Sequence, residues 1–351
     1  MIKLDRRLIT GIRDAQSGPD LYFYLGQAVK LEHSTIPPYL TALFSLKPGT
    51  NQAIAQRIHS IVVEEMLHMT IASNVLIAIG GNPQINTKDF VPEYPGSLPL
   101  QIGHDLQVGI EAFSIPLVEK VFMGIEEPEH PVPVHTAVSL GAEAVPEFAT
   151  IGEFYDAIQT QIRALGPSIF THTTAPPQVV SNEWFPPEKL FPITGVDSAC
   201  HAIDIIKLEG EGTSTTPFES PGDPAHFYKF GEIAAGRELI QTPAGFAYAG
   251  PPIPFDTAGV WPLRANCKIG QFAEGTQART RIERFAYSYS ALLNALHETF
   301  NGYPEKLNAA IGMMYDLRVF AVALMQTEIG DGSGQTVGPS FEFVNVQGGM
   351  S

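Results

Sequence analysis

Apolar residues along this chain recur at helical spacing in several long segments, which are separated by proline- and glycine-rich stretches. The clearest segment is 57–81, where apolar residues three and four positions apart form one helix face. A similar stripe covers 21–46, and the short turn at 47–50 predicts that the two helices are antiparallel neighbours. Pro37 and Pro38 lie inside the 21–46 stripe, so the pattern predicts a kinked helix there.

The rest of the chain is also helical in pattern but less regular. Apolar periodicity predicts further helices at 1–16, 114–126, 150–165, 194–210 and 223–236, and a hairpin of two helices over 272–329. Long connections rich in proline and glycine separate several of these helices, as in bundles with crossover connections. We expect an all-α protein, with a metal-binding four-helix bundle over 1–245. A C-terminal helical hairpin over 246–351 packs on it and is not an independent domain.

Three charged residues lie on the apolar stripes of the first two long helices. Glu65 and His68 form a Glu-x-x-His pair on the 57–81 stripe, and Glu32 is in register on the 21–46 stripe. A carboxylate and an imidazole three residues apart point the same way from a helix, which suits two ligands of one metal ion. The alternative is that these residues reach water, or form a salt bridge, at the edge of the core.

The second half of the chain offers a less regular set of candidates. Glu153 could supply a further ligand, although Thr150-x-x-Glu153 is also a capping box, whose glutamate bonds back to the helix start. Glu209 ends an apolar stripe, but position 212 is glycine, so a second Glu-x-x-His pair is absent. His226 lies on the apolar face of the next helix and is the candidate for the missing imidazole, with a buried core histidine as the alternative.

Several other titratable residues are interpreted as structural or as supports for the ligands. Glu64 is four residues before His68 and could replace Glu65, although its side of the helix is more polar. The remaining members of this group are His33, Glu126, Glu232, His297 and Glu328.

Composition and charge narrow the classes of function. Of 351 residues, 44% are hydrophobic and 17% charged, which is typical of a globular protein and not of a disordered one. Acidic residues outnumber basic ones by 37 to 21, so we expect no nucleic-acid partner, and bound cations could balance part of the excess. The two cysteines cannot form a disulfide framework. The pattern shows neither a signal peptide nor an uninterrupted apolar span, so we expect a soluble, cytoplasmic protein with no membrane partner.

Four passages of the sequence resemble a known family. They are LGQAVKLEHSTIPPYLTALFSL, VEEMLHMTIASNVLIAIGGNP, TIGEFYDAI and the region from EGEGT to HFYKFGEI. Together they resemble the ferritin-like domain of iminophenyl-pyruvate dimer synthases, the enzymes of bisindole pigment pathways, over about residues 20–240. The resemblance implies a ferritin-like bundle with a metal site and an oxidative role in secondary metabolism. Those enzymes are much longer chains, so the dimer synthase activity and its substrate do not transfer.

These observations lead to a functional hypothesis. We expect a non-haem, di-iron oxidoreductase that uses O2 on a small organic molecule, with manganese or zinc as other metals that accept these ligands. The predicted metal ligands are Glu32, Glu65, His68, Glu153, Glu209 and His226. The alternatives are a non-catalytic metal-binding or storage protein and a metal-free scaffold that kept the fold. Whether the chain forms a homo-oligomer is left open.

Overall fold

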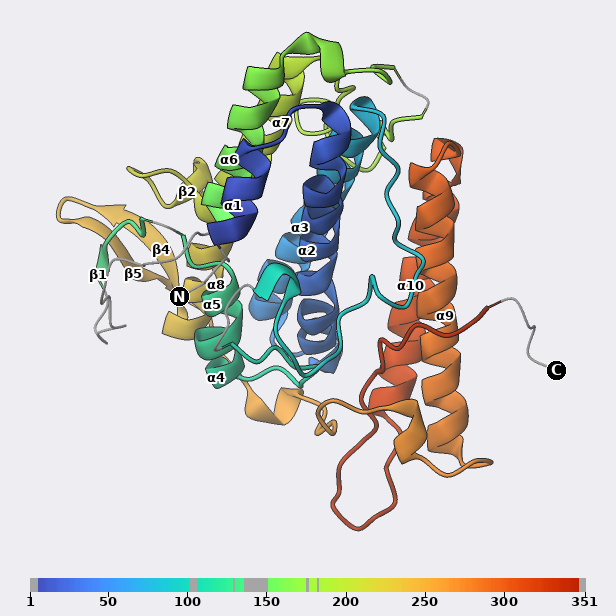
Figure 1. Ribbon diagram of the computed structural model, residues 1–351. Helices are drawn as coiled ribbons and strands as arrows, with labels where there is room; N and C mark the ends of the chain where they lie inside the picture. The colour runs from blue at the N-terminus through green and yellow to red at the C-terminus, as the bar shows by residue number, and fades with distance from the viewer. Residues whose placement is uncertain are drawn as a thin grey trace.

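The chain folds as a helical bundle with small sheets on one side and a helical hairpin on the other (Figure 1). The computed structural model describes residues 6–101, 106–128, 130–135, 151–174, 177–181 and 183–346. The predicted all-α bundle with long crossovers and a C-terminal hairpin is confirmed. The small sheets are additions that the sequence pattern did not predict.

Four long helices make up the bundle. They are α2 (Gly18–Ser45), α3 (Gln52–Ala78), α6 (Ile151–Leu165) and α7 (Val196–Glu211). α2 packs along α3, α6 packs along α7, and contacts from α3 to α7 and from α2 to α6 join the two pairs. Their apolar stripes meet in one continuous core, which supplies the main driving force for folding. The short α1 (Arg6–Arg13) packs against α6 and α2.

α2 runs unbroken through Pro37 and Pro38. A proline has no backbone N–H, so Pro38 leaves the carbonyl of Ser34, four residues earlier, without its helical partner. The hydroxyl of Tyr94, from the following crossover, donates to that carbonyl at 2.6 Å. A side chain from the crossover therefore satisfies a backbone group that the proline pair leaves free, in the same helix that carries Glu32.

The crossovers contain short helical pieces and are tied to the bundle by side-chain amides. In the first crossover, α4 (Ile115–Leu117), the π-helical segment η2 (Val118–Phe122) and α5 (Met123–Ile125) occupy the predicted 114–126 helix. In the second, the buried amide of Asn74 on α3 donates to Val179 O at 2.7 Å and accepts from Val179 N at 2.9 Å. The side-chain amide of Asn74 thus bonds both the N–H and the C=O of Val179 and fixes this loop to α3. Short 3-10 turns complete the connections: η1 (Pro99–Gln101), η3 (Pro167–Ile169), η4 (Thr257–Gly259), η5 (Ile269–Gln271) and η6 (Pro304–Lys306).

Two small sheets flank α8 (His226–Ala235). β4 (Arg237–Thr242) and β5 (Gly245–Pro252) form an antiparallel hairpin, and β1 (Val134–His135) pairs in parallel with β5. β2 (Phe218–Ser220) and β3 (Asp223–Pro224) pair just before α8. Leu239 of β4 and Tyr248 of β5 pack on Tyr228 of α8 in a small apolar cluster of their own. The passage after α8 is rich in proline and glycine and lacks helical periodicity, and no strands are predicted there from the sequence.

The predicted C-terminal hairpin consists of α9 (Gln277–Phe300) and α10 (Leu307–Met325). It lies beside α2 and α3 (Figure 1), and the hydroxyl of Tyr289 on α9 is 2.8 Å from Nε2 of the buried His33 on α2. Apolar residues of the hairpin belong to the same core as the bundle. The division at residue 245 stays a prediction.

Within the part of the chain that the structure describes, two helical segments are long and apolar enough to cross a membrane by length and composition alone. The apolar window of α3 is 83% buried in the bundle, so this helix is a core element here. The second segment, Pro304–Met325, includes α10 and is 33% buried, because Tyr315 and Val319 face outward.

Candidate metal centre

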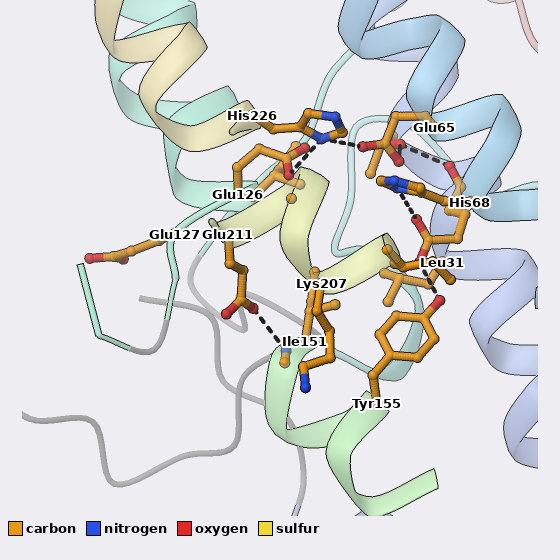
Figure 2. A pocket seen from close by; sticks show the side chains of 16 residues that line it. Leu31, Glu65, His68, Glu126, Glu127, Ile151, Tyr155, Lys207, Glu211 and His226 are labelled. Carbon is orange, nitrogen blue, oxygen red and sulfur yellow. Dashed lines mark hydrogen bonds and ion pairs between the residues drawn. The ribbon is translucent and has the colours of Figure 1, made fainter. Parts of the chain in front are cut away.

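Three carboxylates and two imidazoles surround one buried cavity of about 40 Å³ in the bundle core. They are Glu32 on α2, Glu65 and His68 on α3, Glu126 directly after α5, and His226 at the start of α8. None of the five is more than 8% exposed. Figure 2 shows Glu65 and His68 of α3, Glu126 and His226 of α8 pointing toward one another. Buried charges of this kind are costly unless they are paired or bind a cation.

His226 presents one ring nitrogen to the cavity and the other to a carboxylate behind it. Its Nε2 is 3.1 Å from Glu64 Oε2, on the side away from the cavity centre. Its Nδ1 is 2.9 Å from Glu65 Oε1 and 3.5 Å from Glu126 Oε2. Among the described residues this buried Nδ1 has no hydrogen bond of acceptable geometry, in spite of these short distances. A nitrogen that faces two carboxylate oxygens in this way is placed as a metal ligand would be.

His68 has the same arrangement. Its Nε2 is 2.9 Å from Glu209 Oε2, and its Nδ1 is 3.7 Å from Glu32 Oε2. The other oxygen of Glu209, Oε1, is 2.5 Å from Lys189 Nζ. The rings of His68 and His226 stack with centroids 5.4 Å apart and planes 27° apart. Both imidazoles therefore direct Nδ1 to the same cavity and Nε2 to a carboxylate outside it.

Buried hydroxyl groups hold one oxygen of each cavity carboxylate. Thr35 Oγ1 donates to Glu65 Oε2 at 2.9 Å, Tyr39 Oη donates to Glu126 Oε1 at 2.5 Å, and Tyr155 Oη donates to Glu32 Oε1. The second oxygen of each carboxylate is the one near an imidazole Nδ1. The hydroxyls thus orient the carboxylates so that one oxygen of each is available to a ligand in the cavity.

The buried charged groups of the site shift one another's pKa values. Burial alone would lower the pKa of His68, but hydrogen bonding to Glu209 and the nearby Glu32 carboxylate outweighs burial and raises the pKa to about 10. Burial and the negative charge of Glu126 raise the pKa of Glu65 to about 7. The protein without a bound cation therefore keeps a proton on the His68 imidazole near neutral pH. A cation that binds here takes the place of that positive charge.

A comparison with protein-family models gives a match to a family described as "Ferritin-like" over residues 25–235. The chain belongs to the ferritin-like family. The expected ferritin-like bundle is thereby confirmed, and members of this family often bind metals. The matched region includes all five residues around the cavity.

One protein of similar sequence and one of similar structure were found for this ferritin-like chain. Dichlorochromopyrrolate synthase of Lentzea aerocolonigenes is 26% identical over 306 residues, which is 80% of this chain but 29% of the relative. The chain therefore spans less than a third of the length of this relative. A crystal structure of a ferritin-like protein from Caulobacter vibrioides has a TM-score of 0.62 at 24% identity and covers 92% of this chain and 98% of its own. The second likeness concerns the fold alone.

The ferritin-like bundle brings four of the six predicted ligands to the cavity and leaves Glu153 and Glu209 out of its lining. Glu32, Glu65, His68 and His226 line the cavity, and Glu209 contacts His68 from behind. The same structure places Glu153, in the first turn of α6, half-buried and outside the set of residues that line the cavity. Tyr155, two positions later, takes the inward place instead. The capping-box alternative involves Thr150, which lies outside the described residues.

Glu126 is the carboxylate that the sequence pattern did not assign as a ligand. By sequence it is grouped with the residues that are structural or that support the ligands. Glu126 directly follows an apolar stripe that ends at Ile125, and this position could have indicated that Glu126 is buried. The π-helical segment η2 lies just before it, and π-helical turns are frequent at functional sites.

A second charged cluster adjoins the centre behind His226. Glu64 Oε2 is 3.2 Å from Lys229 Nζ, and the same ammonium group is 3.0 Å from Asp223 Oδ1. Glu219 approaches Glu64 and Asp223 closely enough for the three to be a possible cation site. Burial and the negative charge of Glu64 raise the pKa of Glu219 to about 8. Lys229 pairs with two of the three carboxylates, so this cluster is a shell of charged groups behind His226.

Proposed function

We propose that this ferritin-like protein is a metal-dependent oxidoreductase that uses O2 to oxidise a small organic molecule, with iron as its metal. The observation that supports the proposal is the convergence of three carboxylate oxygens and two imidazole nitrogens on one buried cavity. Carboxylates and imidazoles together are ligands for iron, manganese and zinc. Iron bound here would supply electron transfer to O2, which the side chains of the protein cannot supply by themselves.

The residues around the cavity favour binding of an organic substrate on its outer side, next to the metal. Leu31, Ile125 and Ile206 give the cavity apolar walls that exclude bulk water. The cavity of about 40 Å³ has room for an ion with water or O2 but not for an organic substrate. Lys207 and Glu211 also line it, farther from the imidazoles (Figure 2), and give an organic substrate polar partners at this outer side.

The curated relative supports a biosynthetic setting for the reaction. Dichlorochromopyrrolate synthase carries a region 26% identical to this chain within a much longer protein. A role of this protein in secondary metabolism fits that likeness, as it fits the family resemblance of the sequence. The substrate of the relative is not transferred, because this chain spans only 29% of it.

The proposal is tested by loading the purified full chain with Fe(II) without oxygen and then adding O2. We expect bound iron, uptake of O2 and a change in the absorption spectrum, all lost in Glu65→Ala/His68→Ala. Thermal unfolding of that variant shows whether it is folded. A chain that binds no iron, manganese or zinc, or that binds the same amount in the folded variant, contradicts the proposal.

A second candidate is a protein that binds metal without catalysis. The small size of the cavity favours it, because an ion and its water fill the available space. Uptake of O2 separates the two candidates. Iron that remains Fe(II) in air, with no O2 consumed, supports binding without catalysis and excludes the oxidoreductase.

A further inference from the structure

The cavity carboxylates have few oxygens available for coordination. In a centre with two metal ions, the ions are about 3.5–4 Å apart, and carboxylates bridge them by using both oxygens. Here Thr35, Tyr39 and Tyr155 each hold one oxygen of a cavity carboxylate by a hydrogen bond. Each carboxylate is left with one oxygen near an imidazole, which suits terminal coordination of a single ion.

Both oxygens of Glu209, the fourth carboxylate of the predicted ligand set, lie beside a basic group outside the cavity, although Oε1 makes no hydrogen bond among the described residues. Oε2 accepts from His68 Nε2 at 2.9 Å, and Oε1 is 2.5 Å from Lys189 Nζ. Glu209 also does not line the cavity. Glu64 stands in the same relation to His226, with its Oε2 3.1 Å from Nε2 and 3.2 Å from Lys229 Nζ. Each imidazole is therefore backed by a carboxylate that is itself paired with a lysine.

We propose that the centre binds one metal ion per chain, and not the two that the bundle pattern predicts. The ion would be held by Glu65, His68 and His226, whose ligand atoms form one compact group. Glu32 and Glu126 line the same cavity beside the two imidazoles. Glu209 and Glu64 are positioning residues that fix the tautomer and orientation of His68 and His226. This inference rests on the proposed metal-binding function.

One pair of ligand atoms has the spacing of neighbours around a single ion. Atoms about 2.1 Å from one octahedral ion lie about 3.0 Å apart when adjacent. His226 Nδ1 is 2.9 Å from Glu65 Oε1, whereas the pairs His226–Glu126 and His68–Glu32 are wider, at 3.5 and 3.7 Å. Ligand atoms of Glu65, His68 and His226 all lie within 4.8 Å of one another. The buried Nδ1 of His226, which lacks a hydrogen bond among the described residues, is directed into this space.

The test is the ratio of metal to protein in the full chain after saturation with Mn(II) and removal of free metal. We expect a ratio of one and the electron paramagnetic resonance spectrum of an isolated ion. A ratio of two with the spectrum of a spin-coupled pair overturns the one-ion centre but leaves the metal-dependent function intact. Failure to bind Mn(II), Fe(II) or Zn(II) overturns both, so the two failures are distinguishable.

Variants at the fourth carboxylate sharpen the test. Glu209→Gln keeps an oxygen that accepts from His68 Nε2, so we expect one ion per chain with affinity weakened by roughly 10- to 100-fold. Glu209→Ala removes that acceptor and should weaken the affinity further at the same ratio. Glu153→Gln is the matched control and should change neither quantity. Loss of one of two ions in Glu209→Gln, with the other retained, overturns the inference.

Discussion

At the scale of residues, the imidazoles of the centre are held by carboxylates that lie behind them. Glu64 lies between the ring of His226 and the ammonium group of Lys229. These contacts and the other positive charges nearby outweigh the effect of burial and lower the pKa of Glu64 to about 2. Glu64 thus stays ionised and accepts from His226, which keeps the other ring nitrogen free to face the cavity.

Glu219, in the same shell, leads to a prediction on pH and stability. Its carboxyl has an ordinary pKa of 4.5, and in the folded protein burial and the charge of Glu64 raise the pKa to about 8. The folded state therefore holds one more proton than the unfolded state between these values, so stability falls as pH rises from 4.5 to 8. Glu219→Gln removes this dependence. As pH rises across this range, the melting temperature of the variant should therefore increase relative to that of the unmodified protein.

Thermal unfolding of both proteins over that pH range measures the effect. Glu274→Gln, at an exposed position, is the matched control and should follow the unmodified protein at every pH. A difference between Glu219→Gln and the unmodified protein that is the same at every pH contradicts the raised pKa.

At the scale of elements, the crossovers do more than connect the bundle helices. The segment 115–125 ends by placing Glu126 at the cavity, and Tyr94 satisfies the backbone of α2 beside the proline pair. The loop before α7 is held by the amide of Asn74, and no part of that side chain is exposed. Long loops of this kind stay ordered only if their buried backbone groups find partners.

Replacing Asn74 tests this role of the side-chain amide. Asn74→Ala leaves the N–H and C=O of Val179 without their partner, at a cost of about 1–3 kcal/mol for each unsatisfied buried group. We expect the free energy of unfolding to fall by that order and hydrogen exchange around 177–181 to increase, with the metal ratio unchanged. Asn82→Ala, at an exposed site after α3, is the control. Equal stabilities of the two variants contradict the anchoring role.

At the scale of the whole molecule, the metal centre lies where the bundle meets the added elements. α2 and α3 supply three of its residues, whereas Glu126 comes from a crossover and His226 from a helix that carries the small sheets. A cation that binds there joins α3 and α8, which lie far apart in the sequence. Binding therefore requires the folded chain, and metal binding and folding are coupled.

Removal of metal should accordingly destabilise the whole protein. At a free metal concentration of about 100 times Kd, binding stabilises the folded state by about 2.7 kcal/mol. Scanning calorimetry should show a higher melting temperature for metal-loaded protein than for chelator-treated protein. In Glu65→Ala/His68→Ala the two preparations should melt together. A melting temperature of the unmodified protein that does not respond to metal would indicate that no cation binds the centre.

Some properties of the whole molecule stay predictions. The cytoplasmic location and the absence of nucleic-acid and membrane partners follow from composition and pattern. The net charge of −16 remains the argument against a nucleic-acid partner. Formation of a homo-oligomer is checked by the molar mass in solution.

The bundle helices and the inward positions of Glu32, Glu65 and His68 could be predicted from local sequence patterns. A side chain that faces the core from a long amphipathic helix must lie on its apolar stripe, and helical periodicity is a local property. The other residues around the cavity could not be predicted in this way. The tertiary structure placed Glu126 and Tyr155 inward and set Glu209 behind His68, because these positions depend on how distant segments pack and on which oxygen each hydroxyl occupies.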